Sequence, residues 1–199
     1  DSTAFVLDII HYSLSCVSAS ITLINSEPIS PPAMGDIKDD DANTIWEMSE
    51  DGCYVGLTHD YLNIQQAIDK VRSPAAGAIV LFAGTTRDNF AGKPVKELQY
   101  TAYNKLALRT MLSICKDILS KHGLKGISMI HRLGTVPIGE ESILIAVSSP
   151  HRQAAWRAGE EALEACKSRV EVWKKEEFEG EEGIWRANRD GAMGQRVDS

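Results

Sequence analysis

The stretch SSPHRQAAWRAGEEALEACKSRVEVWKKEEF (residues 148–178) holds a predicted helix, a predicted strand and a concentration of basic side chains. Ser149 is expected to cap the helix, with Pro150 at its first position, where a missing N–H costs no hydrogen bond. The helix carries a stripe of mostly small side chains, which lets it lie close on a sheet: Ala155, Ala158, Gly159, Ala162, Leu163, Cys166 and Val170. The following VEVW predicts a short strand, and Lys174 has the same parity as its valines.

The residues before this stretch predict five strands and two helices, in the order β-α-β-β-α-β-β. Strands are expected at 53–58, 76–84, 95–103, 126–134 and 141–149, and helices at 64–72 and 105–122. Asn63 is expected to cap the first of these helices, and Gly123 to end the second. A polar loop is expected at 85–95 and a turn at 137–139. This order predicts one α+β domain with a mixed or largely antiparallel sheet.

Charge divides the chain into two parts. Residues 1–51 hold ten acidic residues and one basic residue, a net charge of −9, whereas the other 148 residues hold 18 acidic and 20 basic residues, a net charge of +2. We therefore predict an acidic, poorly ordered N-terminal extension over residues 1–53 and a folded domain over 54–199. Met34, after a proline cluster, is a candidate start. Asp8 and His11 interrupt the apolar run near residue 1, so no membrane segment is predicted.

The sequence carries few signals of metal, nucleotide or nucleic-acid chemistry. Its four cysteines form no CxxC pair and have no zinc spacing, so buried, reduced thiols are expected. No glycine-rich phosphate loop, GxSxG or HExxH motif occurs. No basic stripe with interleaved aromatic residues occurs either, so we expect no nucleic-acid partner.

Basic residues at the ends of predicted elements are the candidates for chemistry. Arg87 follows a predicted strand, and His151 and Arg152 stand at a helix start, where free N–H groups favour an anion. Lys167 and Lys174 lie on either side of the end of the same helix. An anion-binding site is one interpretation of this set. The other is a solvated surface, with His151 in a structural hydrogen bond.

Five blocks of sequence, taken in order, are similar to one known family. They are GAIVLFAGTTRDNFAGKPV (77–95), ELQYTAY (97–103), IHRLGTVPIGE (130–140), VSSPHR (147–152) and CKSRVEVWKKEEF (166–178). Over about residues 54–190 the chain resembles the MoaE family, the catalytic (large) subunits of molybdopterin synthase. The acidic leader and the acidic run EEFEGEEG (176–183) depart from the family pattern. The run is expected to be a solvated turn, and modulation of carrier docking is the alternative.

The resemblance implies an α/β hammerhead-type fold, of class α+β, with an additional antiparallel β subdomain. It further implies a cytosolic sulfurtransferase that converts cyclic pyranopterin monophosphate to molybdopterin. The sulfur would come from the C-terminal thiocarboxylate of a small ubiquitin-like carrier subunit, and two large subunits would form a homodimer within a heterotetramer. No metal and no other cofactor is implied.

The resemblance also assigns roles to single residues. Lys167 and Lys174 match the family's two active-site lysines. The shell that binds the pterin phosphate would comprise Arg87, His151, Arg152 and Arg189, and Arg189 would reach the site of a neighbouring subunit. The role of Lys167 stays open between base, electrostatic stabiliser and acyl acceptor. A non-catalytic docking module for a ubiquitin-like Gly-Gly tail is the alternative function.

Overall fold

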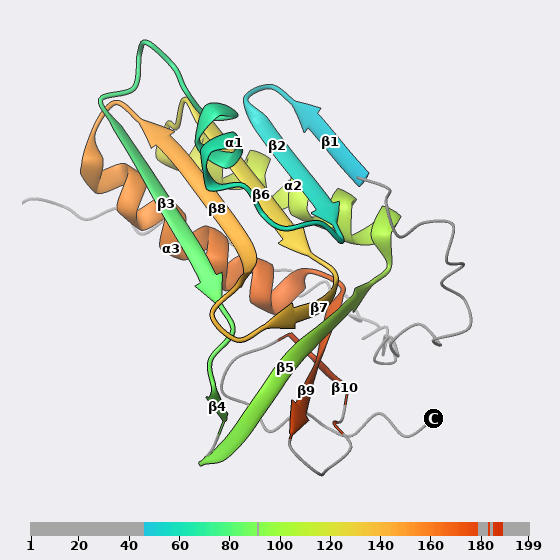
Figure 1. Ribbon diagram of the computed structural model, residues 1–199. Helices are drawn as coiled ribbons and strands as arrows, with labels where there is room; N and C mark the ends of the chain where they lie inside the picture. Colours follow the sequence, from blue (N-terminus) through green and yellow to red (C-terminus); the bar gives the residue numbers. More distant parts are fainter. Residues whose placement is uncertain (1–45, 91, 179–182, 184, 189–199) are drawn as a thin grey trace, which may run out of the picture.

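A five-stranded sheet with the order β1-β2-β6-β8-β3 forms the centre of the molecule (Figure 1). Its strands are β1 (Trp46–Glu50), β2 (Cys53–Thr58), β6 (Gly126–Arg132), β8 (Glu141–Ser149) and β3 (Ala78–Thr85). Strands β2 and β6 run parallel, and every other pair of neighbours is antiparallel. This computed structural model describes residues 46–188 except 91, 179–182 and 184.

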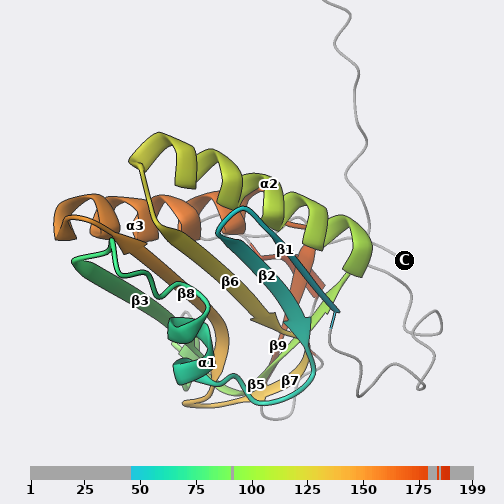
Figure 2. The ribbon, with the colours of Figure 1, turned by 90° about the horizontal axis from the view of Figure 1, so that it is seen from above.

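Helices cover both faces of this sheet. Figure 2 shows α2 (Asn104–His122) and α3 (Arg152–Arg169) side by side on one face, with α1 (Ile64–Asp69) on the other. The caps agree with the sequence: Asn63 Oδ1 accepts a hydrogen bond from the N–H of Gln66 at 3.1 Å, and Gly123 ends α2 with φ 60°. Glycine adopts this left-handed conformation without strain, so the helix stops there.

Strand β8 is the most buried strand of the central sheet. Successive side chains of a strand point to opposite faces. Ile145 and Val147 accordingly belong to the large core under α2 and α3, whereas Leu144 belongs to a smaller cluster with Ala67 of α1. With a helix on each face, β8 reads as a continuous apolar run rather than an alternating one.

The small side chains of α3 are buried as predicted. Ala155, Ala158 and Ala162 have no exposed surface, and a Cβ on Gly159 would lie 3.7 Å from Val80 of β3. Side chains of this size bring the helix backbone close to β3 and β8. The positions of the side chains in the last turn of α3 therefore depend on this contact.

A second, wholly antiparallel sheet lies at one end of the central sheet. It comprises β4 (Asn89–Phe90), β5 (Lys93–Ala102), β7 (Gly134–Pro137), β9 (Val172–Phe178) and β10 (Trp185–Ala187). Its main path is β10-β9-β5-β4, and β7 pairs with β5. The predicted α+β class and the additional antiparallel unit are both confirmed.

The start of α3 differs from the prediction. His151 is the N-cap residue and Arg152 the first helical residue, so the helix begins two residues later than expected. Ser149 is instead the last residue of β8, paired with Ala78, and its carbonyl accepts a hydrogen bond from the N–H of Gly77 at 3.0 Å. Strand pairing with β3 keeps Ser149 extended, which overrides its local tendency to cap a helix.

Two predicted loops are partly strands. The expected polar loop at 85–95 contains β4 and the first residues of β5, and the expected turn near Pro137 begins inside β7. The acidic run starts within β9, where Glu176 pairs with Leu98 of β5 and is only 3% exposed. The solvated-turn prediction is therefore wrong for residues 176–178, because pairing with β5 draws them into the sheet. Residues 179–182 lie outside the described residues.

The predicted extension also contributes to the fold. Residues 46–50 form β1, which pairs antiparallel with β2, so the expected boundary at residue 53 falls inside the central sheet. Lys116 of α2 holds Glu50 in an ion pair of 2.6 Å. Residues 1–45, with the candidate start Met34, lie outside the described residues. Among the described helices, none has the length and apolar character needed to span a membrane.

His131 of β6 is a fully buried side chain at the junction of the two sheets. Its ring packs edge-on against Tyr100 of β5 at 4.9 Å between centroids, and its Nδ1 lies 2.8 Å from the carbonyl oxygen of Arg132. Burial lowers the pKa of His131 to about 4, against the opposing effect of that hydrogen bond. The ring is therefore uncharged at neutral pH.

We expect Ala158→Leu to destabilise the protein by about 1–3 kcal/mol, because the larger side chain forces α3 away from the sheet. Glu160→Leu, two residues away on the exposed side of α3, is the matched control and should change the free energy of unfolding by less than about 0.5 kcal/mol. Urea denaturation measures both. Equal losses for the two variants would show that close packing of α3 is not required.

Stability should fall as the pH is lowered from about 6.5 towards about 4. In this window the unfolded His131 binds a proton that the folded one does not, so acid favours unfolding, with a slope of up to ~1.4 kcal/mol per pH unit. Urea denaturation of wild type and His131→Asn across this range isolates the effect, since other titrating groups are common to both. A difference between the two proteins that does not vary with pH would contradict this expectation.

Candidate active site

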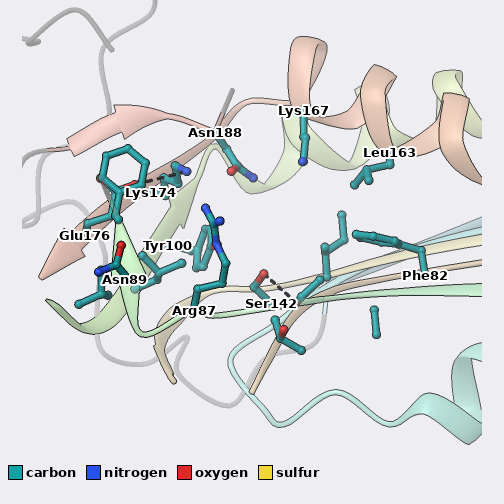
Figure 3. Close-up of a pocket in the computed structure, with 17 residues that line it drawn as sticks. Phe82, Arg87, Asn89, Tyr100, Ser142, Leu163, Lys167, Lys174, Glu176 and Asn188 are labelled. Atoms are coloured by element: carbon teal, nitrogen blue, oxygen red, sulfur yellow. Dashed lines mark hydrogen bonds and ion pairs between the residues drawn. The ribbon is translucent and has the colours of Figure 1, made fainter. Parts of the chain in front are cut away.

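A cavity of about 590 Å³ lies where the end of α3 meets both sheets (Figure 3). The central sheet contributes residues of β3 and β8, and the second sheet contributes residues of β4, β5 and β9. Its larger apolar lining residues are Phe82, Phe90, Val95, Leu98, Tyr100, Ile143 and Leu163. This mixture of aromatic and aliphatic surface with charged groups suits a flat ring that carries an anionic substituent.

Lys167 enters the cavity from the last turn of α3. Figure 3 shows its side chain directed into the cavity, on the same helix face as Leu163 one turn earlier. Ala162 and Cys166 lie in the neighbouring buried stripe and fix the rotation of the helix. The packing of α3 on the sheet therefore decides the direction of Lys167.

Lys174 enters from β9 and is held by a buried carboxylate. It lies opposite Arg186 of β10, and two cations on neighbouring strands repel each other. Glu176 compensates both charges: Oε1 lies 3.4 Å from Lys174 Nζ, and Oε2 lies 3.9 Å from Arg186 Nη1. The side chain of Glu176 is 4% exposed and that of Lys174 16%. This ion-paired group keeps Lys174 at the cavity wall.

Arg87 enters from the segment after β3. It is exposed, and Figure 3 shows its side chain directed into the cavity. The preceding Thr86 is buried, its N–H donates to the carbonyl of Glu140 at 3.0 Å, and its own carbonyl accepts from the N–H of Gly139 at 2.9 Å. These bonds anchor the backbone beside Arg87, and its exposed side chain extends from this fixed point.

The thiol of Cys166, adjacent to Lys167 in sequence, is not arranged for chemistry. It is 3% exposed, and burial raises its pKa to about 12, against a smaller lowering by Lys167. A thiol that stays protonated is a weak nucleophile. The described part of the cavity therefore offers cations rather than a reactive thiolate from Cys166.

The structure brings three of the six predicted site residues together: Arg87, Lys167 and Lys174. His151 and Arg152 are exposed at the opposite end of α3. Fifteen residues separate Arg152 from Lys167 in sequence, which is about 22 Å of helix at 1.5 Å per residue. These two residues therefore do not line the cavity of their own chain. Arg189 lies outside the described residues.

Sequence reasoning missed three residues at or beside the cavity: Glu176, Arg186 and Asn188. Glu176 was placed in an acidic solvated run, although its spacing of two residues from Lys174 puts both on one side of a strand. Arg186 and Asn188 carry no periodic signal in the sequence. They belong to the site because β10 pairs with β9.

Three cations from three separate segments converge on one concave surface. Arginine binds a phosphate or carboxylate through two parallel hydrogen bonds, and each lysine adds a point charge with three donors. The arrangement can hold one or two anions against a ring that contacts the apolar lining. It can also stabilise negative charge that develops during a reaction.

The comparisons with known proteins agree with this geometry. Residues 57–169 match the family model described as MoaE protein. The molybdopterin synthase catalytic subunit of Pyricularia oryzae is 75% identical over 157 residues, which cover 79% of this chain and 86% of that protein.

Two solved structures share the fold. Molybdopterin synthase from Staphylococcus aureus is 34% identical, with a TM-score of 0.62 over 65% of this chain and 94% of that one. A Helicobacter pylori complex of subunits 1 and 2 of molybdopterin-converting factor contains a chain that is 20% identical, with a TM-score of 0.53 over 64% of this chain and 87% of that one. At that identity the second likeness concerns the fold alone. The family model and the 75% identical relative show that the chain belongs to the MoaE protein family.

Proposed function

We propose that this protein is the catalytic subunit of a molybdopterin synthase, a sulfurtransferase that converts cyclic pyranopterin monophosphate to molybdopterin in molybdenum cofactor biosynthesis. The observation that carries the proposal is the convergence of Arg87, Lys167 and Lys174 on one cavity in a member of the MoaE family. The 75% identical relative, a molybdopterin synthase catalytic subunit by name, supports the same activity.

The proposed reactants match the charges of the cavity. The substrate brings a phosphate on a flat heterocycle, and the carrier subunit brings the thiocarboxylate of its C-terminal tail. Both are anions, so fixed cations can hold them together in one orientation. The apolar lining, with Phe82, Phe90 and Tyr100, supplies surface on which the heterocycle packs.

Each sulfur transfer then has two bond-forming steps. The thiocarboxylate sulfur forms a C–S bond to the substrate, with departure of an oxygen substituent, which leaves the carrier attached as a thioester. Water then attacks the acyl carbon, breaks its bond to sulfur and releases the carrier as a carboxylate. Two such transfers give a dithiolene. Lys167 and Lys174 are placed to stabilise the negative charge that develops in these steps.

The proposed partner is a small ubiquitin-like sulfur-carrier subunit, and two large subunits are proposed to form a homodimer within a heterotetramer. The 75% identical relative is named a catalytic subunit, which supports an enzyme of more than one component. We propose a cytosolic location, which fits the buried free thiols of Cys53, Cys115 and Cys166.

Lys167→Ala is expected to lower the rate of dithiolene formation by about 100-fold or more, because charge at the reacting atoms is no longer stabilised. Lys167→Arg separates electrostatic stabilisation from the other two roles of this lysine, base and acyl acceptor. Arginine keeps the charge but does not act as a base or acyl acceptor, so recovery of activity indicates electrostatic stabilisation. The measurement is single-turnover conversion of cyclic pyranopterin monophosphate by thiocarboxylated carrier.

Lys105→Ala, which removes an exposed lysine of α2, is the matched control and should retain wild-type turnover. Mass spectrometry of the stalled reaction tests the acyl-acceptor role, since a covalent Lys167–carrier adduct has a unique mass. Wild-type turnover by Lys167→Ala would remove this lysine from the mechanism. Carrier binding without any turnover by the wild type would favour the docking module.

The separation of His151 and Arg152 from Lys167 bears on the assembly. Because α3 holds the two groups about 22 Å apart, His151 and Arg152 can join the predicted phosphate shell only in the cavity of a second subunit. The surface around them supports such an interface. Trp156, one turn after Arg152, is 65% exposed, and Ile79 of β3 is 38% exposed. Exposed large apolar side chains of this kind are common at subunit contacts.

Mixing two inactive variants tests this composite site. In a heterodimer of Lys167→Ala with Arg152→Ala, one of the two cavities regains both intact residues. Random exchange of subunits in an equal mixture should therefore restore about a quarter of wild-type activity. A mixture of Lys167→Ala with Lys174→Ala is the control and should stay inactive, since both lysines line the same cavity. If the first mixture recovers no activity, Arg152 and Lys167 of different subunits do not act in one cavity, and the composite site is wrong.

A further inference from the structure

Asn188 lies at the cavity and is held by two hydrogen bonds. It follows β10, and its backbone N–H donates to the carbonyl of Val172 at 3.1 Å. Its side-chain Nδ2 lies 3.3 Å from Nε2 of the buried His131. Figure 3 shows the Asn188 side chain projecting into the cavity from the strand side, between the labelled Lys174 and Lys167. The amide is therefore fixed at both its backbone and its side chain.

The surroundings of His131 decide which way this amide points. A carbonyl oxygen only accepts hydrogen bonds, so His131 Nδ1, 2.8 Å from the carbonyl of Arg132, carries the ring proton. Nε2 of the neutral ring is then an acceptor and needs a donor opposite it. Because burial lowers the pKa of His131, the neutral form persists at neutral pH. The NH₂ end of Asn188 must face the histidine, and Oδ1 points away from it.

The side-chain oxygen of Asn188 can accept a hydrogen bond, which the three cations of the cavity cannot do. Arginine and lysine side chains are donors only. The other amide in the described lining, Asn89, uses its Oδ1 to accept from the backbone N–H of Gly92 at 3.1 Å. Glu176 is ion-paired with Lys174 and Arg186. Asn188 thus presents an oriented acceptor to a ligand whose anionic part binds the cations.

We propose that Asn188 is a substrate-contact residue whose Oδ1 accepts a hydrogen bond from an N–H of the substrate heterocycle, and that His131 is the residue that positions it. This proposal rests on the proposed function. The two roles follow from donor and acceptor chemistry. The cationic donors Arg87, Lys167 and Lys174 bind the anionic groups, and the acceptor oxygen of Asn188 recognises the ring. Asn188 then discriminates the pterin from other phosphates.

The test compares two ligands on the full chain in complex with its carrier subunit. Calorimetry with cyclic pyranopterin monophosphate should show about tenfold weaker binding to Asn188→Ala, the loss expected for one oriented hydrogen bond. Binding of inorganic phosphate should change by less than about twofold, because the cations are untouched. Gln65→Ala removes an exposed amide of α1 and is the matched control, with both affinities at the wild-type level.

His131→Phe tests the positioning step, because it keeps a ring against Tyr100 and removes the acceptor for Asn188. It should raise the KM for the pterin as Asn188→Ala does, with kcat within about twofold of wild type. The double variant should show no further loss, since both changes remove one interaction. Asn188 is only partly buried, so Asn188→Ala alone decides the contact even where His131→Phe does not fold.

The outcomes separate this inference from the proposed function. A wild type that neither binds the pterin nor forms dithiolene overturns both. A wild type that turns over while Asn188→Ala binds the pterin with unchanged affinity overturns the Asn188 contact alone. Equal weakening towards the pterin and inorganic phosphate also overturns it, because the residue would then act on the cations or the fold. Additive losses in the double variant would overturn the role of His131.

Discussion

The close contact between α3 and the central sheet is the constraint on which the site depends. Ala155, Ala158 and Ala162 have no exposed surface, so a larger side chain at any of them would have to displace the helix or its neighbours. A helix fixed in this way has one rotation and one axial position. Lys167, in its last turn, is therefore directed at the cavity by packing that lies one to three turns away. Catalytic geometry here is set by small apolar residues.

Charge compensation is the second requirement of the site. A cavity that concentrates cations for anionic ligands must also be stable when empty, and like charges at close range oppose folding. Glu176 resolves this conflict, since its buried carboxylate lies within ion-pair distance of Lys174 and Arg186. Removing only that carboxylate would leave cations that are largely desolvated and uncompensated. The acidic run of the sequence thus contributes a group to the basic site.

The fold was predictable wherever a local pattern determined the outcome. The helical period fixed α2, Gly123 fixed its end, and Asn63 fixed the start of α1. Prediction failed where pairing with a strand distant in sequence determines the local structure. Pairing with Ala78 keeps Ser149 in β8, and pairing with Leu98 buries Glu176. The residues of the site also fall into a predictable and an unpredictable group. Lys167, Lys174 and Arg87 carried a recognisable pattern, whereas the place of Asn188 follows from the β9–β10 pairing, which only the three-dimensional structure reveals.

The largest error of the sequence-based prediction was to place residues from both ends of α3 in one site. His151, Arg152 and Lys167 appear as one basic cluster within 17 residues of chain. An α-helix of that length is a rod, so its two ends cannot approach each other. The helix holds Arg152 at one end and Lys167 at the other, and the exposed Trp156 lies near the first end. If the residues at both ends of the helix act on one phosphate, as the family resemblance implies, the unit of function is larger than one chain.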